Sequence, residues 1–102
     1  MTSATHTERE NFVAELVRHR PQTQNHHVQR LMRYAAGYWK LNERRRRDGI
    51  HMSLRDQFKY QRIKSAVSEI CEELQCKPAF GHSLNLMVNT GEWQKIIRVP
   101  II

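Results

Sequence analysis

The stretch VQRLMRYAAGYWKLNERRRR, residues 28–47, decides how this sequence folds, because it combines a long helical pattern with a run of positive charge. At 100° per residue its apolar side chains gather within roughly 80° of one another, as in a helix that lies against a core. We therefore predict a helix over about residues 24–47, capped by Thr23 and ending at the turn sequence Asp48-Gly49. The apolar face comprises Val28, Leu31, Tyr34, Ala35, Tyr38 and Trp39, with Met32 and Leu41 at its edges.

A second long helix is predicted over about residues 53–75. Ser53 is a suitable N-cap, and Asp56 places negative charge in the first turn, where the helix dipole favours it. The stripe that should face the preceding helix is Ile63, Val67, Ile70 and Leu74. Since a short turn joins the two helices, we expect an antiparallel helical hairpin.

Leu54 and Phe58 do not belong to that stripe, because they project about 140–180° away from Ile63. Two interpretations stay open. Either both side chains pack on the N-terminal helix, which is the favoured interpretation, or they form an exposed apolar patch for a partner.

A short N-terminal helix is predicted to begin at the capping box Thr7-x-x-Glu10 and to end before Pro21. Its apolar side chains are Phe12, Val13, Leu16 and Val17. We expect residues 1–6 to be flexible, and the polar N-terminus lacks the apolar segment of a secretory signal. A cytoplasmic protein is the resulting expectation.

Beyond Pro78 the pattern changes to strict alternation, which predicts strands. Leu84, Leu86 and Val88 alternate with more polar residues, Asn89-Thr90-Gly91-Glu92 is a turn signal, and residues 93–99 form the return strand. The sequence thus predicts a single α+β domain over residues 1–102: three helices, two of them in a long antiparallel hairpin, packed with a C-terminal two-stranded β-hairpin. A winged helix is an alternative, but the helices are longer than helix-turn-helix elements normally are.

The positive charge is concentrated in the helical hairpin. Residues 30–64 contain eleven basic and three acidic residues, a local net charge of +8, whereas the whole chain carries +7. A cluster of this kind at one end of a hairpin is the electrostatic signature of a site for a polyanion. The predicted nucleic-acid-binding residues are Arg33, Lys40, Arg44, Arg47, Arg55, Lys59 and Arg62.

A plainer interpretation of the charge also stays open. Cations near a helix C-terminus stabilise the helix dipole, and long arginine stems cover apolar surface. Arg45 and Arg46 are excluded from the predicted site because they should project toward the core side of their helix.

No pattern in the chain indicates catalysis or a bound metal. Cys71 and Cys76 are too far apart for a metal-binding pair, so buried thiols are expected. The adjacent His26 and His27 point about 100° apart and should have capping or surface roles. The acidic residues Glu69, Glu72 and Glu73 should form a solvated face rather than a site for a basic partner. We therefore expect no enzyme, no cofactor, no metal and no membrane-spanning segment.

The C-terminal part resembles small uncharacterised phage and prophage proteins with a helical body and a C-terminal β-hairpin. The resemblance rests on Glu-Leu-Gln-Cys-Lys-Pro-Ala-Phe (73–80), on Leu-Asn-Leu-Met-Val (84–88) followed by Gly91 and Trp93, on Val99-Pro100, and on Arg-Tyr-Ala-Ala-Gly-Tyr (33–38). The closing strand departs from the Gly-rich stretch typical of those proteins, and no functional residue can be transferred. The resemblance implies an accessory protein of a mobile element in a bacterial cytoplasm.

Two functions are therefore expected as alternatives. The leading one is a non-enzymatic basic accessory protein that binds nucleic acid or a nucleoprotein complex. The second is a protein-binding modulator that inhibits a host nuclease or CRISPR effector through Leu54, Phe58 and the β-hairpin. A homodimer could form through the same apolar pair or through the tail Val99-Pro100-Ile101-Ile102.

Overall fold

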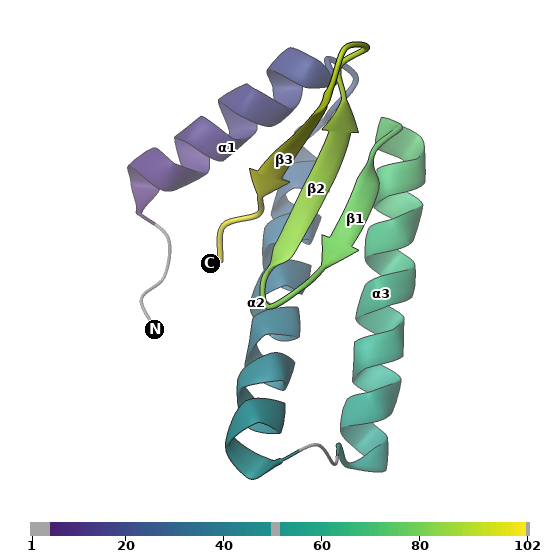
Figure 1. Ribbon diagram of the computed structural model, residues 1–102. Coiled ribbons are helices and arrows are strands. Elements are labelled where there is room, and N and C mark those ends of the chain that lie inside the picture. Colours follow the sequence, from purple (N-terminus) through teal and green to yellow (C-terminus); the bar gives the residue numbers. More distant parts are fainter. Residues whose placement is uncertain (1–4, 50–51, 102) are drawn as a thin grey trace.

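The computed structural model describes residues 5–49 and 52–101, in which three helices precede three strands (Figure 1). The elements are α1 (His6–His19), α2 (Asn25–Asp48), α3 (Leu54–Leu74), β1 (Lys77–Phe80), β2 (Leu84–Asn89) and β3 (Gln94–Arg98). The predicted α+β fold is confirmed. The sheet differs in detail, because it has three strands instead of two.

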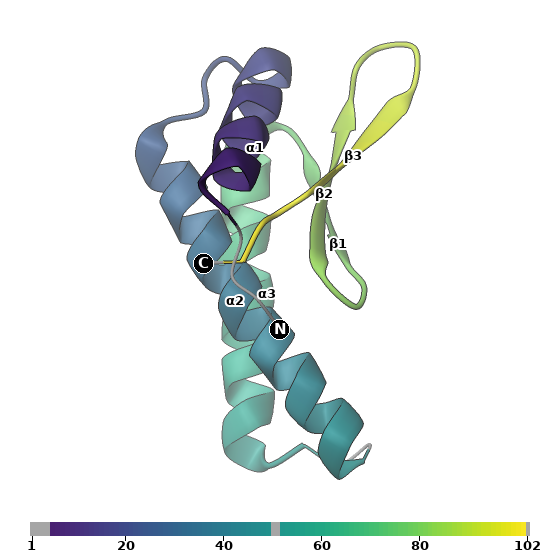
Figure 2. The same cartoon turned by 90° about the vertical axis from the view of Figure 1, so that its left-hand side faces the viewer.

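The long helices α2 and α3 form the helical hairpin, and the sheet lies on one side of it (Figure 2). A small residue allows the helices to approach closely: a Cβ atom at Gly37 would lie 3.2 Å from Ile63 Cδ1. The short helix α1 lies beside β3, away from the turn that joins α2 to α3 (Figure 1).

The sheet is an antiparallel meander in the order β1-β2-β3. Met87 of β2 is paired with Lys77 of β1 on one side and with Ile96 of β3 on the other. We missed β1 because Lys-Pro-Ala-Phe is short and contains Pro78. Proline has no N–H for the ladder, but an edge strand such as β1 tolerates it. Trp93, predicted to open the return strand, lies in the turn before β3.

The helix starts differ slightly from the predictions. The sequence contains two overlapping capping patterns, and the structure uses the earlier one: Thr5 Oγ1 accepts a hydrogen bond from the Glu8 N–H at 3.1 Å. Residues 1–4 of the segment predicted to be flexible lie outside the described residues. At α2 the N-cap is Gln24 instead of Thr23. Ser53 caps α3 as predicted, its Oγ accepting from the Asp56 N–H at 3.1 Å.

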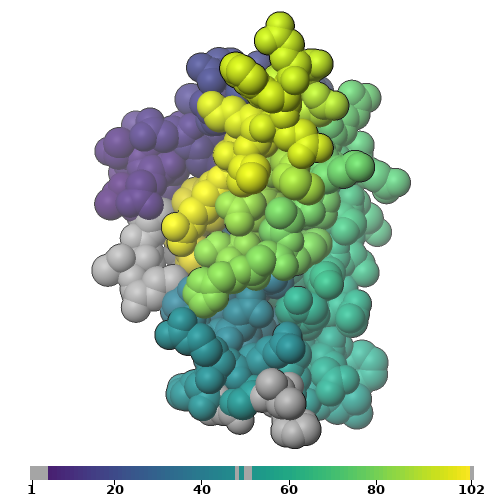
Figure 3. All heavy atoms as spheres, viewed as in Figure 1, coloured from purple at the N-terminus to yellow at the C-terminus, as the bar shows by residue number. Residues whose placement is uncertain are grey.

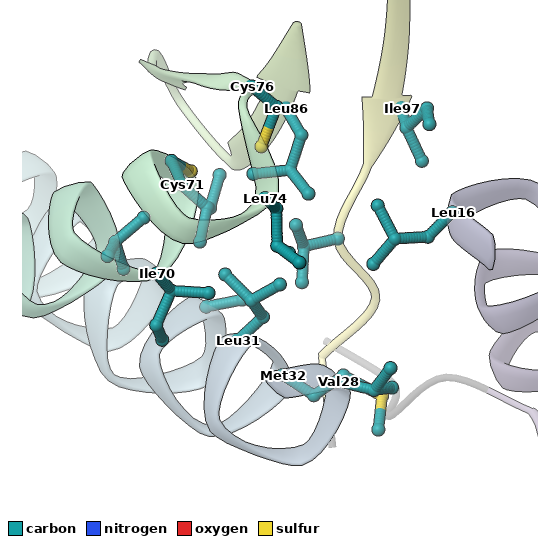
Figure 4. Close-up of a cluster of buried hydrophobic side chains, with 14 of the residues drawn as sticks. Leu16, Val28, Leu31, Met32, Ile70, Cys71, Leu74, Cys76, Leu86 and Ile97 are labelled. Carbon is teal, nitrogen blue, oxygen red and sulfur yellow. The ribbon is translucent and has the colours of Figure 1, made fainter. Parts of the chain in front are cut away.

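The core lies between the sheet and the three helices (Figure 4). Leu16 of α1, Leu31 of α2, Leu74 of α3 and Leu86 of β2 are each at most 1% exposed. Burial of a leucine side chain is favourable by about 1.5–3 kcal/mol, so side chains of this kind hold the sheet on the helices. The chain after β3 also enters the core, where Val99 is fully buried.

Two polar side chains fix the sheet to the helices. The Tyr38 hydroxyl, on α2, donates to the Gly81 carbonyl in the β1–β2 turn at 2.5 Å, and burial raises the pKa of Tyr38. The Arg20 guanidinium, just after α1, donates to the Gln75 carbonyl at the end of α3 and to the Asn89 carbonyl at the end of β2.

The sheet covers only part of the helical hairpin. Between Leu41 and Ile63 no described residue is buried, and the space-filling view shows this end of α2 and α3 extending past the sheet (Figure 3). We call residues 42–62 the projecting end. Of its described residues, Met52 and Tyr60 pack against the core, and both are only half-buried.

Candidate nucleic-acid interface

Helix α2 places four predicted cations on one side. Arg33, Lys40, Arg44 and Arg47 are separated by seven, four and three residues, the spacings at which helical side chains share a face. All four residues are exposed. The helical periodicity that buries Leu31 and Tyr38 thus presents these cations to solvent.

Helix α3 contributes three more exposed cations. Arg55, Lys59 and Arg62 line a shallow hollow at the start of the helix, and Arg44 of α2 lines the same hollow. The structure therefore brings predicted cations of both helices together.

A second shallow hollow adjoins the first, because Arg44 lines both. Lys40 and Arg47 also line the second hollow. Six of the seven predicted residues therefore line one pair of hollows, whereas Arg33 lies about two turns before Lys40, outside both hollows. We call the seven residues together the cationic face: Arg33, Lys40, Arg44, Arg47, Arg55, Lys59 and Arg62.

Few acidic groups neutralise these cations. Asp56 Oδ1 lies 3.5 Å from Arg44 Nη2, so Arg44 is not the free cation that the sequence pattern indicated. Glu43 lies 3.9 Å from Arg46 and 3.5 Å from His82, and it also lines the second hollow, so its carboxylate offsets part of the positive charge there. Within residues 5–49 and 52–101, the cations of the face that form no ion pair are Arg33, Lys40, Arg55, Lys59 and Arg62.

Arg46 lines the second hollow, so its exclusion from the predicted site was wrong. Arg45 and Arg46 are both exposed and enter no core. They do lie on the side of α2 toward the sheet, beside Gly81 and His82 of the β1–β2 turn. At this level of α2, however, the sheet has already ended. Arg30 and Lys64, the first and last cations of the basic stretch, contact aromatic rings instead of lining the hollows. Arg30 lies over the Tyr34 ring, and Lys64 lies over the Tyr60 and Phe80 rings.

The favoured interpretation of Leu54 and Phe58 is wrong. Neither side chain packs on α1, because α1 lies at the other end of the helical hairpin (Figure 1). Leu54 is 68% exposed and Phe58 is 66% exposed, and both line the hollow that contains Arg55, Lys59 and Arg62. The exposed apolar patch, the second interpretation, is what the structure contains.

Trp39 is a residue of this surface that the sequence analysis assigned to the core. Its side chain is only half-buried and lines the second hollow with Lys40 and Arg44. Its position next to Lys40, at the side of the predicted apolar face, could have indicated partial exposure. Periodicity alone, however, does not show where a neighbouring sheet ends.

The C-terminal tail is not a free dimer contact. Val99, Pro100 and Ile101 are buried within the chain, and the Val99 N–H donates to the Leu84 carbonyl at 3.0 Å. Ile102 lies outside the described residues.

The remaining polar groups have structural roles. Both cysteines are buried, as predicted. The hydrogen bond between Cys71 and Cys76 raises the pKa of Cys71 and lowers that of Cys76. His27 Nδ1 accepts the Gln24 N–H at 3.1 Å, and His27 Nε2 lies 2.9 Å from Glu73 Oε2, so this histidine caps α2 and joins it to α3.

Two other features are absent from residues 5–49 and 52–101. No cluster of three or more histidine, cysteine or acidic side chains in residues 5–49 and 52–101 could hold a metal ion. Among the helices described, none has the length and apolar character to cross a membrane.

Comparisons of this chain with protein-family models, with curated proteins and with solved structures yielded no match. The function must therefore be argued from the residues themselves.

Proposed function

We propose that this chain is a non-enzymatic, basic accessory protein that binds nucleic acid, alone or within a nucleoprotein complex, through the cationic face. One observation carries the proposal. Exposed cations from two helices line two adjoining hollows, and the described acidic residues of this end, Glu43 and Asp56, are both already paired.

The physical reason is counterion release. A nucleic acid holds condensed cations near its phosphates, and basic side chains that replace them release those cations to the solution. The five cations of the face that form no ion pair among the described residues supply this free energy without first breaking such a pair. We expect phosphate contacts without base-specific reading, because nothing in the cationic face forms a recognised base-reading motif.

The test is the salt dependence of binding to a fluorescently labelled oligonucleotide of about 16 nucleotides, measured by fluorescence anisotropy. The site variant replaces Arg55, Lys59 and Arg62 with glutamine. A matched control replaces three exposed cations outside the cationic face with glutamine: Arg18, Lys77 and Arg98. Both variants lower the net charge from +7 to +4, so only the place of the charge differs.

We expect the site variant to reduce the slope of log affinity against log salt by about 2, the share of three phosphate contacts on a single strand. The control should keep the slope of the unmodified chain. Two results would overturn the proposal: no binding of any oligonucleotide at low salt, or an equal loss of slope in both variants.

The proposed setting is a bacterial cytoplasm, where the protein acts as an accessory factor of a phage or other mobile element. This part of the proposal rests on the resemblance of residues 73–100 to phage and prophage proteins. Detection of the native protein in the soluble fraction of a lysogen, bound to nucleic acid, is the corresponding test.

A second candidate function has one specific observation in its favour. Besides Leu54 and Phe58, the side chains of Trp93 and Ile96 at the β-hairpin are 69% and 66% exposed. Such side chains could dock on a host nuclease or CRISPR effector as an inhibitor. Its test is binding to a purified effector in the absence of nucleic acid, and binding that persists in a Leu54→Ser, Trp93→Ser variant would count against it.

A further inference from the structure

Phe58 lies in a cationic setting that is unusual for an exposed phenyl ring. It is 66% exposed, Arg55 precedes it by three residues, and Arg62 follows it by four. Residues at these spacings lie beside each other on a helix, so Arg55 and Arg62 are the neighbours of Phe58 along this side of α3. Lys59 also lines this hollow, as does the ion pair of Arg44 with Asp56, so three of the four cations around it remain without an acidic partner among the described residues.

This setting favours a ligand that combines negative charge with flat aromatic groups. The apolar part of the hollow consists of Leu54 and Phe58. Two side chains provide far less apolar surface than the roughly 800 Å² per partner of a stable protein interface. The surrounding cations would in addition require a strongly acidic protein. A strand with unpaired bases meets both conditions, because its phosphates fit the cations and any base can stack on a ring.

A duplex fits the hollow less well. Its bases are stacked on one another and its outer surface is phosphate, so an exposed phenyl ring would face charged groups without a stacking partner. Trp39 adds a second ring on the neighbouring hollow, beside Lys40 and Arg44. Since Arg44 lines both hollows, one strand could contact both rings in succession.

We infer that the ligand of the cationic face is a single-stranded nucleic acid and that Phe58 is the platform on which one of its bases stacks. The inference rests on the proposed function, since it names the class of nucleic acid bound there. It extends the function from phosphate contact, which any polyanion provides, to recognition of unpaired bases.

The experiment measures the affinity of the full chain for a labelled oligothymidylate and for a duplex of equal length at one salt concentration. Phe58→Leu keeps an apolar side chain and removes the ring. Trp93→Leu is the control, because Trp93 is 69% exposed but lies in the β2–β3 turn, outside the cationic face. Both residues are exposed, so neither change should disturb folding, and circular dichroism checks this. Phe58→Trp restores an aromatic ring.

We expect Phe58→Leu to weaken single-strand binding about 5- to 150-fold, the range of one lost base–ring stack. The salt slope should stay unchanged because no charge is removed, Phe58→Trp should restore binding, and Trp93→Leu should have no effect. In Phe58→Trp, stacking should also quench the added tryptophan fluorescence.

The outcomes separate this inference from the proposed function. Salt-dependent binding that is equal in the unmodified chain and in Phe58→Leu, or that is tighter for the duplex, overturns the inference and leaves the proposed function intact. No binding of either oligonucleotide overturns both. Unchanged oligonucleotide binding combined with loss of a stoichiometric protein complex in Phe58→Leu would instead assign the ring to a protein interface.

Discussion

Replacing Arg20 with alanine should destabilise the fold, because this one side chain bridges three elements. The Arg20 guanidinium donates to the Gln75 carbonyl at 3.0 and 3.2 Å and to the Asn89 carbonyl at 3.0 Å. One side chain thereby joins the end of α1 to the ends of α3 and β2.

The magnitude follows from these contacts. Hydrogen bonds from a charged donor contribute about 1.5–3 kcal/mol each, but Gln75 and Asn89 are exposed, so water can replace the lost donor in part. We therefore assign about 1 kcal/mol to each of the two carbonyls, or about 2 kcal/mol in total. For a domain of this size that loss lowers Tm by about 8–16 °C.

The assay is thermal unfolding followed by circular dichroism, with Arg18→Ala as the matched control. Arg18 is exposed and forms an ion pair with Glu15 at 3.1 Å, a contact that should contribute less than about 1 kcal/mol. Arg20→Lys should recover only part of the stability, because an ammonium lacks the planar fork that reaches both carbonyls. A Tm for Arg20→Ala within the range of Arg18→Ala would refute the reasoning.

Two further predictions concern single contacts. Tyr38→Phe leaves the Gly81 carbonyl without its donor and should cost about 1 kcal/mol in urea unfolding; a change below the error of the measurement would contradict this. Lys95→Met should raise the pKa of Glu15, since the hydrogen bond from Lys95 holds that pKa below its usual value of 4.5. A carboxylate with a lowered folded-state pKa contributes stability that is present above its unfolded pKa and is lost as the pH falls through the folded value. The variant should therefore lose less stability on acidification, and an NMR titration in which the pKa of Glu15 stays unchanged would count against it.

The helices could be predicted because their information is local. The i, i+4, i+7 spacing of Ile63, Val67 and Ile70 and the Ser53 cap lie within a few turns of one another, and helical periodicity reads such patterns directly. The start of α1 was ambiguous for the same reason, since Thr5 and Thr7 each begin a pattern of the capping-box type.

The contacts between elements could not be predicted. The carbonyls that accept hydrogen bonds from Arg20 lie 55 and 69 residues away. Because every residue has a backbone carbonyl, the sequence does not show which ones will be acceptors. The strand β1 depends on pairing with β2, because three of its four residues, Lys77, Pro78 and Ala79, are poor strand formers.

The candidate site was predicted in part. Helical spacing placed Lys40, Arg55 and Arg62 on exposed surfaces, but the pairing of Arg44 with Asp56 depends on how two helices cross. Whether Phe58 was covered depended on the position of α1, which no local pattern encodes.

The lack of buried residues between Leu41 and Ile63 also has a consequence for how the protein can evolve. Substitutions in a core are limited by packing, whereas exposed positions usually tolerate change within about 0.5 kcal/mol. The exposed residues among 42–62 can therefore diverge in charge while the fold stays unchanged, whereas Met52 and Tyr60, which pack against the core, are more constrained. Homologues of this chain should accordingly vary most at this end, so that new ligands can be acquired there with little loss of foldability.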